Sequence, residues 1–415
     1  MTLIAGLNQS QPAPAVLELP GLYGPFTFPE KLLQKIWLRR NFDSARARTT
    51  RGEAVVILHP GKWNLLGGPD FKNARLRFGD GPEVTGDIEL HLHANDWAGH
   101  RHANDTAYNG VILHVVLFVP SPGHITRGHD GGELPVLALL PLLHHDLEEY
   151  AAEDAVEALA NRPATQIVER LGLLPPAQLS ALLNKHASER WRQKVHYARL
   201  RIERLGWTEA CHQTAMEILG YRFNRAAMLR VAAAFPLAIW DGGTVDPETA
   251  FQSGGDWSLQ GLRPANQPRV RLRQYIEWTK ARRDWPERLA KGRVSLPAGS
   301  LETDTGTARK ELRMTAFREA LLDSINGGAV HGTRFDTLVC DGFLPLLAAK
   351  NGCDVQGLWF HWFAGDVPPE WRHALRQLEM FAGRLQPACH GLAQGLLGWL
   401  IEQERSARVS AGHRA

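Results

Sequence analysis

The N-terminal part of the chain is a series of short segments in which apolar positions repeat at helical or strand spacing. Residues 29–42 (PEKLLQKIWLRRNF) place apolar side chains on one stripe and basic side chains opposite, which predicts an amphipathic helix. Residues 54–59 (AVVILH) and 71–78 (FKNARLRF) predict two strands, separated by a glycine-punctuated loop. A helix that covers strands indicates an α/β layer.

The next segment alternates strictly between apolar and polar positions. The turn signal GDGPEVTGD at residues 79–87 leads into a strand in which Glu89, His91 and His93 share the polar face. Residues 111–119 are apolar except for His114, which predicts a strand buried on both faces. We interpret His114 as a core histidine with satisfied hydrogen bonds.

The remainder of the chain has helical periodicity. Helices are predicted at residues 151–162, 176–206, 207–220, 225–235 and 271–289, and through the last hundred residues. Residues 241–261 and 290–311 are glycine-rich and predicted as loops, and residues 1–20 are expected to lack regular structure. We therefore expect an α+β protein, with an α/β domain at residues 1–145 and a mainly helical domain at residues 146–415.

Charge and composition refine this division. The net charge is +3, yet residues 1–150 hold 13 basic and 16 acidic side chains, so the basic excess lies in the helical part. Ten of the 18 histidines fall between His59 and His145. The four cysteines have no C-x-x-C spacing, and neither a signal peptide nor a membrane-spanning run is apparent. We expect a cytoplasmic protein.

Two carboxylates on neighbouring predicted strands carry the most specific chemistry. Asp70 follows Gly67-Gly68-Pro69, and Glu89 precedes Leu90-His91. Phosphodiester hydrolysis needs hard oxygen ligands for a divalent cation and a group that positions water. A structural alternative is a turn role for Asp70 and an ion pair between Glu89 and Arg75 or Arg77.

Pro69-Asp70 followed by Glu89-Leu90-His91 resembles the PD-(D/E)xK nuclease pattern, with His91 where lysine is usual. The resemblance implies a restriction-endonuclease-like fold for residues 1–145. It also implies that Asp70, Glu89 and the Leu90 carbonyl hold Mg²⁺ or Mn²⁺, while His91 orients the attacking water. Lys72, on the same strand face as Asp70, would supply the missing ammonium, and Glu30 on the preceding helix would be an accessory acid.

A second cluster of polar residues follows the Glu89 strand. Its members are His93, Asp96, His100, His102, Asp105 and Tyr108, which are predicted as accessory site residues or as a hydrogen-bond network. The run from WNxxxGPDF through GDIELH to DWxxHxHxxDxxYxxVILHVV resembles the hallmark of a bacterial family of proteins of unknown function. Residues 189–194, 219–224 and 262–272 are similar to later blocks of that family.

Basic side chains in the helical part are candidates for binding a nucleic-acid backbone, although a run of basic residues on a helix, such as the one from Arg190 to Arg204, is usually a solvated face. They are Arg190, Arg192, Lys194, Arg263, Arg269 and Arg271.

Three hypotheses follow. The first is a metal-dependent phosphodiesterase that acts on nucleic acid, in which the Asp70 and Glu89 carboxylates lie within a few ångströms of each other. The second is an inactive binding or scaffold protein, in which they diverge or pair with arginines. The third is a metal hydrolase of a small substrate, in which His91, His93, His100 and His102 converge on one ion.

Overall fold

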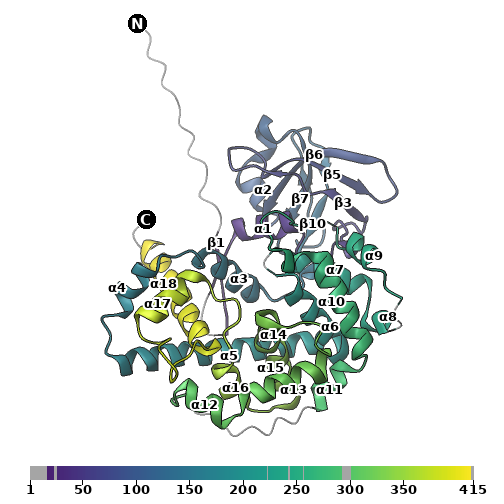
Figure 1. Cartoon of the computed structure of the whole chain (residues 1–415). Helices are drawn as coiled ribbons and strands as arrows, with labels where there is room; N and C mark the ends of the chain where they lie inside the picture. Colours follow the sequence, from purple (N-terminus) through teal and green to yellow (C-terminus); the bar gives the residue numbers. More distant parts are fainter. Residues whose placement is uncertain are drawn as a thin grey trace. The chain divides into compact units, whose positions relative to one another are not determined.

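The computed structural model describes residues 16–22, 26–221, 223–241, 244–255, 257–291 and 301–412. The chain divides into two compact units, Met1–Ala151 and Ala152–Ala415, coloured purple to blue and teal to yellow in Figure 1. The expectation for residues 1–15 and for the loop at 292–300 lies outside the described residues. Strand β1 begins at Val16, so part of the segment expected to lack structure is ordered.

The N-terminal unit is built on a mixed sheet. Its strands are β1 (Val16–Leu19), β2 (Phe26–Pro29), β3 (Val55–His59), β4 (Lys62–Trp63), β5 (Phe71–Phe78), β6 (Glu83–His91), β7 (Val111–Val116), β8 (Thr126–Arg127), β9 (Glu133–Leu134) and β10 (Val136–Ala138). The main sheet has the order β10-β7-β6-β5-β3, and β4 pairs with β5. Strands β3, β5 and β6 are antiparallel, whereas β6, β7 and β10 are parallel.

Helix α1 (Glu30–Arg39) packs against β6 and buries its apolar stripe of Leu32, Leu33, Ile36 and Trp37. The short helix α2 (Asp96–Gly99) lies between β6 and β7. The sequence predicts a helix, three strands, a short helix or loop, and a further strand, and the structure follows this order with the two-residue strand β4 added between β3 and β5. The β5–β6 turn is shorter than predicted, because β6 already begins at Glu83.

The alternation predicted for β6 explains how one strand serves both core and site. Ile88, Leu90 and Leu92 are buried in the apolar core of this unit. Glu89 and His91 face the other way and are buried as well, at 6% and 1% exposed. Burying a charged or polar side chain costs free energy unless it has a hydrogen-bond or charge partner. The face of β6 that carries Glu89 and His91 must therefore provide such partners, whereas the apolar face need not.

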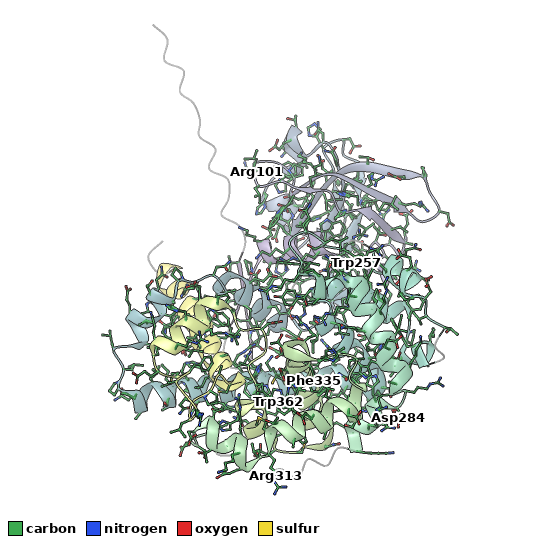
Figure 2. All side chains as sticks on the ribbon, viewed as in Figure 1. Arg101, Trp257, Asp284, Arg313, Phe335 and Trp362 are labelled. Atoms are coloured by element: carbon green, nitrogen blue, oxygen red, sulfur yellow. The ribbon has the colours of Figure 1, made fainter. Side chains whose placement is uncertain are left out.

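The second unit is helical. Its helices are α3 (Leu147–Leu159, which begins in the first unit), α4 (Ala164–Leu171), α5 (Pro176–Leu205), α6 (Trp207–Leu219), α7 (Arg225–Ala234), α8 (Leu237–Asp241), α9 (Pro247–Ser253), α10 (Pro268–Ala281), α11 (Trp285–Lys291), α12 (Thr305–Glu311), α13 (Met314–Asn326), α14 (Gly332–Leu338), α15 (Leu344–Asn351), α16 (Gln356–His361), α17 (Pro369–Gln377) and α18 (His390–Gly412). Phe335 and Trp362 lie in its apolar interior (Figure 2). None of the helices in the described part of the chain is long and apolar enough to span a membrane.

Three predictions for this unit were wrong. The loop predicted at residues 290–311 ends in α12, before which the Asp304 side chain accepts a 2.9 Å hydrogen bond from the Thr307 amide. The single helix predicted at residues 271–289 is two helices, α10 and α11, because Pro286 lacks an amide hydrogen and its ring obstructs a continuous helix. The loop predicted at residues 241–261 contains α9, which begins with Pro247 after an Asp246 cap. The Asp246 side chain accepts a 2.8 Å hydrogen bond from the Thr249 amide, which offsets the low helix propensity of the segment.

Candidate metal centre

Asp70 and Glu89, the carboxylate pair, meet across adjacent strands. Asp70 stands just before β5, and Glu89 lies near the end of the antiparallel neighbour β6. The Asp70 amide donates to Glu89 Oε2 at 3.0 Å, and the Leu90 amide donates to Asp70 Oδ2 at 3.0 Å. Each acid is thus held by the backbone beside the other, which fixes both side chains at one place.

Helix α1 supplies a further contact that sequence reasoning missed. Gln34 donates to Asp70 Oδ1 at 2.6 Å and accepts from Trp63 Nε1 at 3.1 Å. Glu30, the predicted accessory acid, is buried one helical turn earlier, and its charge acts on Glu89. The four-residue spacing of Glu30 and Gln34 on the buried face of α1 was the signal that could have identified Gln34.

The carboxylate pair is electrostatically unfavourable without a cation. Burial raises the pKa of Asp70 to about 6 despite the hydrogen bonds from Leu90 and Gln34. Burial, and next the charge of Asp70, raise the pKa of Glu89 well above its ordinary value. Within the described residues, neither acid forms an ion pair with lysine or arginine. Arg75, one expected partner of Glu89, pairs with Glu83 instead.

Lys72 lies near the pair but is engaged by another acid. Its Nζ is 2.9 Å from Asp87 Oδ2, and Asp87 Oδ1 accepts from the Asn73 amide at 3.1 Å. Asn73 adopts a left-handed backbone (φ 56°) where the β5–β6 register shifts. Asp87 therefore anchors a β-bulge next to the carboxylate pair, and the charge of Lys72 still lowers the pKa of Glu89.

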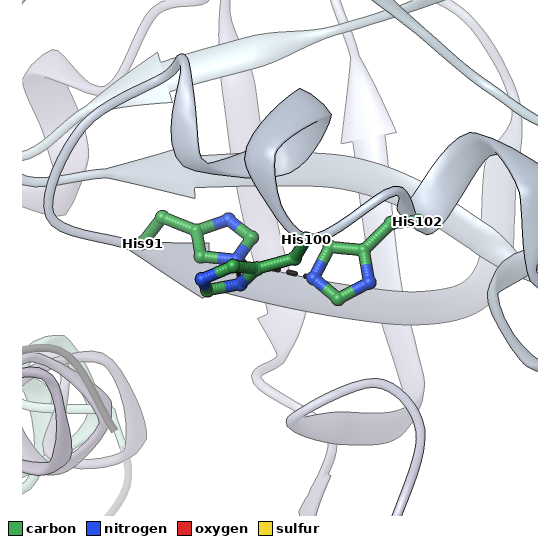
Figure 3. A group of neighbouring side chains, drawn as sticks. All are labelled: His91, His100 and His102. Atoms are coloured by element: carbon green, nitrogen blue, oxygen red, sulfur yellow. Dashed lines mark hydrogen bonds between the residues drawn. The ribbon is translucent and has the colours of Figure 1, made fainter. Parts of the chain in front are cut away.

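Three imidazoles converge on the other side of Glu89 (Figure 3). His91, His100 and His102, the histidine cluster, come from the end of β6 and from the loop after α2. His91 Nε2 lies 3.2 Å from His100 Nδ1 and 3.3 Å from His102 Nε2. Glu89 Oε1 lies 3.6 Å from His91 Nε2 and 3.4 Å from His102 Nε2. Glu89 thus directs one oxygen to Asp70 and the other to the histidines.

Burial favours the neutral form of two of the imidazoles, those of His91 and His102. Burial, followed by repulsion from His114, His102 and His100, lowers the pKa of His91 far below its ordinary value. Burial lowers the pKa of His102 to about 4. Neutral imidazoles have lone pairs available for a metal ion, whereas His91 cannot provide the positive charge of the lysine that it replaces.

His114 is a buried core histidine, as predicted, and it also supports the cluster. Its Nε2 lies 2.9 Å from His91 Nδ1, and its Nδ1 lies 3.2 Å from Thr126 Oγ1. Thr126 Oγ1 is in turn 3.2 Å from His124 Nε2. Burial lowers the pKa of His114 to about 3. This chain fixes the ring orientation of His91.

The remaining predicted accessory residues divide into two groups. Tyr108 stacks on His102 with ring centroids 3.9 Å apart, and burial together with the charges of Glu89 and Asp70 raises its pKa. His93 is exposed, stacks on Phe118, and lies beyond the end of β6. Asp96 and Asp105 accept hydrogen bonds from the His93 and Ala107 amides, as turn residues do.

The predicted nucleic-acid-binding residues lie in the helical unit, and several have protein partners there. Lys194 pairs with Asp341 at 2.7 Å, and Arg269 pairs with Glu248 at 2.9 Å. Arg271 is buried and donates to Gln274 and Asn266. Arg190 donates to Gln193 and Gln394. Arg192 and Arg263 are the exposed members of the set.

These features define a mixed α/β protein whose N-terminal sheet carries a buried group of acids and histidines. Residues 30–253 match the family model described as protein of unknown function (DUF2851), and the chain belongs to this family. No curated protein and no solved structure matches the chain. The matched span includes the carboxylate pair, the histidine cluster and His114.

Proposed function

We propose that this protein is a metal-dependent phosphodiesterase that acts on nucleic acid, with the carboxylate pair as its cation site. The observation that carries the proposal is the reciprocal bonding in which the Asp70 amide donates to Glu89 and the Leu90 amide donates to Asp70. Acids that diverged, or that each paired with an arginine, would have favoured a scaffold. The described residues have neither arrangement.

The donor set fits a hard divalent cation. Carboxylate oxygens are the ligands that Mg²⁺ and Mn²⁺ prefer. The raised pKa values of the two buried acids mean that their charged forms are unfavourable, and a divalent cation would stabilise those charged forms. When bound there, such a cation would polarise a phosphoryl oxygen and lower the pKa of water.

The surrounding side chains support this chemistry by position and charge. Gln34 holds Asp70 from α1, and Asp87 holds the bulge that carries Lys72. Tyr108 is half-buried and keeps its proton because its pKa is raised, so its hydroxyl can donate to a phosphate oxygen. Lys72 provides positive charge that reaches Glu89, in place of the neutral His91.

The element order also supports the proposal. The resemblance to the PD-(D/E)xK pattern includes the order of a helix, three strands, a helix and a strand around the two acids. Helix α1, the antiparallel strands β3, β5 and β6, helix α2 and the parallel strand β7 follow that order. Arg192 and Arg263 are the exposed basic residues that we propose for contact with the nucleic-acid backbone.

The test is cleavage of plasmid and single-stranded DNA and RNA by the purified full chain with Mg²⁺ or Mn²⁺. Asp70→Asn and Glu89→Gln should each reduce the rate about a thousandfold, because the lost cation contributes several kcal/mol. Glu83→Gln is the matched control: it removes an acid from the same strand, but Glu83 is exposed and pairs with Arg75. Equal rates for the wild type and the two site variants would refute the proposal.

A further inference from the structure

We infer that the histidine cluster and Oε1 of Glu89 form a four-ligand site for a zinc-type transition-metal ion. This inference goes beyond the proposed function. It depends on nitrogen donors that the carboxylate pair does not use, and it holds whether or not the protein cleaves phosphodiesters. The donor atoms are His91 Nε2, His100 Nδ1, His102 Nε2 and Glu89 Oε1.

Four of the six distances between the donor atoms are close to those of tetrahedral coordination. Ligands 2.0–2.1 Å from Zn²⁺ at tetrahedral angles lie about 3.3 Å from one another. His91 Nε2 lies 3.2 Å from His100, 3.3 Å from His102 and 3.6 Å from Glu89, His102 lies 3.4 Å from Glu89, and the three histidine donors lie within 4.8 Å of one another. Cis ligands of an octahedral Mg²⁺ would lie about 2.9 Å apart, and Mg²⁺ prefers oxygen to nitrogen.

One of the two possible directions of donation along the His91–His114–Thr126–His124 chain leaves His91 Nε2 without a proton. If His91 Nδ1 donates to His114 Nε2, then His114 Nδ1 donates to Thr126 Oγ1, and the Thr126 hydroxyl donates to His124 Nε2. Every bond in this chain is then satisfied in one direction. In this direction, which is the one a metal ion would select, His91 Nε2 has a free lone pair that faces two imidazole nitrogens and a carboxylate oxygen. A shared cation removes the resulting repulsion.

This hydrogen-bond chain is the usual support for a metal-bound imidazole. A histidine that binds a metal through one nitrogen generally has its other nitrogen held by a hydrogen-bond partner, which fixes its tautomer and orientation. His114 has this role for His91, and Thr126 holds His114. The cluster therefore has an outer set of contacts as well as converging donors.

The backbone between two of the ligands is also unusual. Arg101 separates His100 from His102 and has a left-handed conformation, with φ 59° and ψ 30°. Non-glycine residues adopt this conformation infrequently, and such outliers concentrate at functional sites. The Arg101 side chain is exposed (Figure 2), so the strained backbone does not serve to bury it. Its effect is to let two histidines of one short loop face the same point.

The experiment uses the full chain after removal of metal by a chelator and dialysis. Co²⁺ is added in the presence of excess Mg²⁺, and visible absorption and equilibrium dialysis follow its binding. We expect one Co²⁺ per chain with the strong visible bands of four-coordinate cobalt, and displacement of Co²⁺ by Zn²⁺. His100→Ala and His102→Ala should weaken binding at least a hundredfold. His93→Ala is the matched control, since His93 is in the same segment and exposed.

Absence of stoichiometric Co²⁺ binding by the wild type would overturn the inference, as would equal binding by His93→Ala and His100→Ala. His100 is only half-buried, so its truncation tests the site even if His102→Ala fails to fold. Asp70→Asn separates the two proposals, because it should reduce the cleavage rate about a thousandfold while Co²⁺ binding persists. If no variant or wild type cleaves nucleic acid but Co²⁺ binds, the proposed function fails and the metal site remains.

Discussion

Two buried histidine environments in this molecule differ in the partners that they provide. In the helical unit, His212 is fully buried. Its Nδ1 lies 2.6 Å from the Tyr275 hydroxyl, and its Nε2 lies 3.0 Å from the Phe235 carbonyl oxygen. One nitrogen accepts and the other donates, so both are satisfied. In the N-terminal unit, His91 Nε2 faces two other imidazole nitrogens and a carboxylate oxygen.

The comparison shows that burial alone does not distinguish a structural histidine from a ligand. Both rings are at most 1% exposed, and burial lowers the pKa of both. The difference is chemical complementarity. A hydroxyl and a carbonyl complete the hydrogen bonds of a neutral imidazole, whereas converging imidazole nitrogens and a carboxylate oxygen offer the donor set of a metal ion.

The largest expected difference between the two environments is their response to Zn²⁺. At a free concentration a thousand times the dissociation constant, a bound ion stabilises the folded site by about 4 kcal/mol. Amide exchange in β6 and β7, measured by mass spectrometry on the full chain, should therefore slow by up to about a thousandfold. Exchange in α6 and α10, which carry His212 and Tyr275, should not change.

The control for this prediction is the same measurement on His102→Ala, in which Zn²⁺ should leave β6 and β7 unaffected. Equal protection of the wild type and this variant would mean that Zn²⁺ acts elsewhere on the protein. Protection of α6 and α10 to the same extent would remove the distinction between the two histidine environments.

The second prediction concerns the stability of the folded protein at acidic pH. Burial lowers the pKa of His212 to about 4, from an ordinary value of 6.5. Between these two values the unfolded chain binds a proton that the folded chain excludes, so stability falls as the pH falls from 6.5 through 4. The full effect is about 3 kcal/mol. The measurement is chemical denaturation of the full chain at pH 7.5 and pH 4.5, followed by tryptophan fluorescence.

His212→Gln isolates this contribution, because glutamine cannot titrate. The stability difference between wild type and variant should shrink by about 3 kcal/mol on going from pH 7.5 to pH 4.5. A difference that stays constant with pH would mean that His212 does not resist protonation in the folded protein. Other histidines titrate equally in both proteins and therefore cancel.

The sequence was sufficient to predict that Asp70 and Glu89 lie on neighbouring strands. It was not sufficient to predict all of the side chains that contact them. Strand alternation placed Glu89 and His91 on one face, and the structure agrees. The same alternation, extended to His93, was misleading because β6 ends at His91 and the chain turns where the His93 amide meets Asp96. Periodicity describes a strand and cannot specify where that strand ends.

Other contacts depend on tertiary structure that no local pattern encodes. His114 was correctly interpreted as a core histidine, but its bond to His91 depends on the parallel pairing of β6 with β7. The basic pattern in the sequence includes three side chains that already have partners in the structure. Lys194 pairs with Asp341 and Arg269 with Glu248, both far away in the sequence, and Arg271 donates to Gln274 one helical turn away. A count of charges does not reveal which are already engaged.

The smallest expected effect tests whether Thr126, which contacts His114, influences metal binding by His91. Thr126→Val removes the hydroxyl beside His114 Nδ1 while keeping nearly the same shape at a position that is 3% exposed. His114 then loses the partner that fixes its tautomer, and His91 is held less firmly. We expect Co²⁺ affinity to fall about tenfold, which is about 1.4 kcal/mol.

Two variants are the controls for this prediction. Thr126→Ser should bind Co²⁺ with the affinity of the wild type, because serine keeps the hydroxyl. Thr85→Val, on the exposed face of β6, should leave the affinity unchanged. If the valine and serine variants bind Co²⁺ equally well, the hydroxyl does not act on the metal site, and the comparison with His212 then depends on the donor atoms alone.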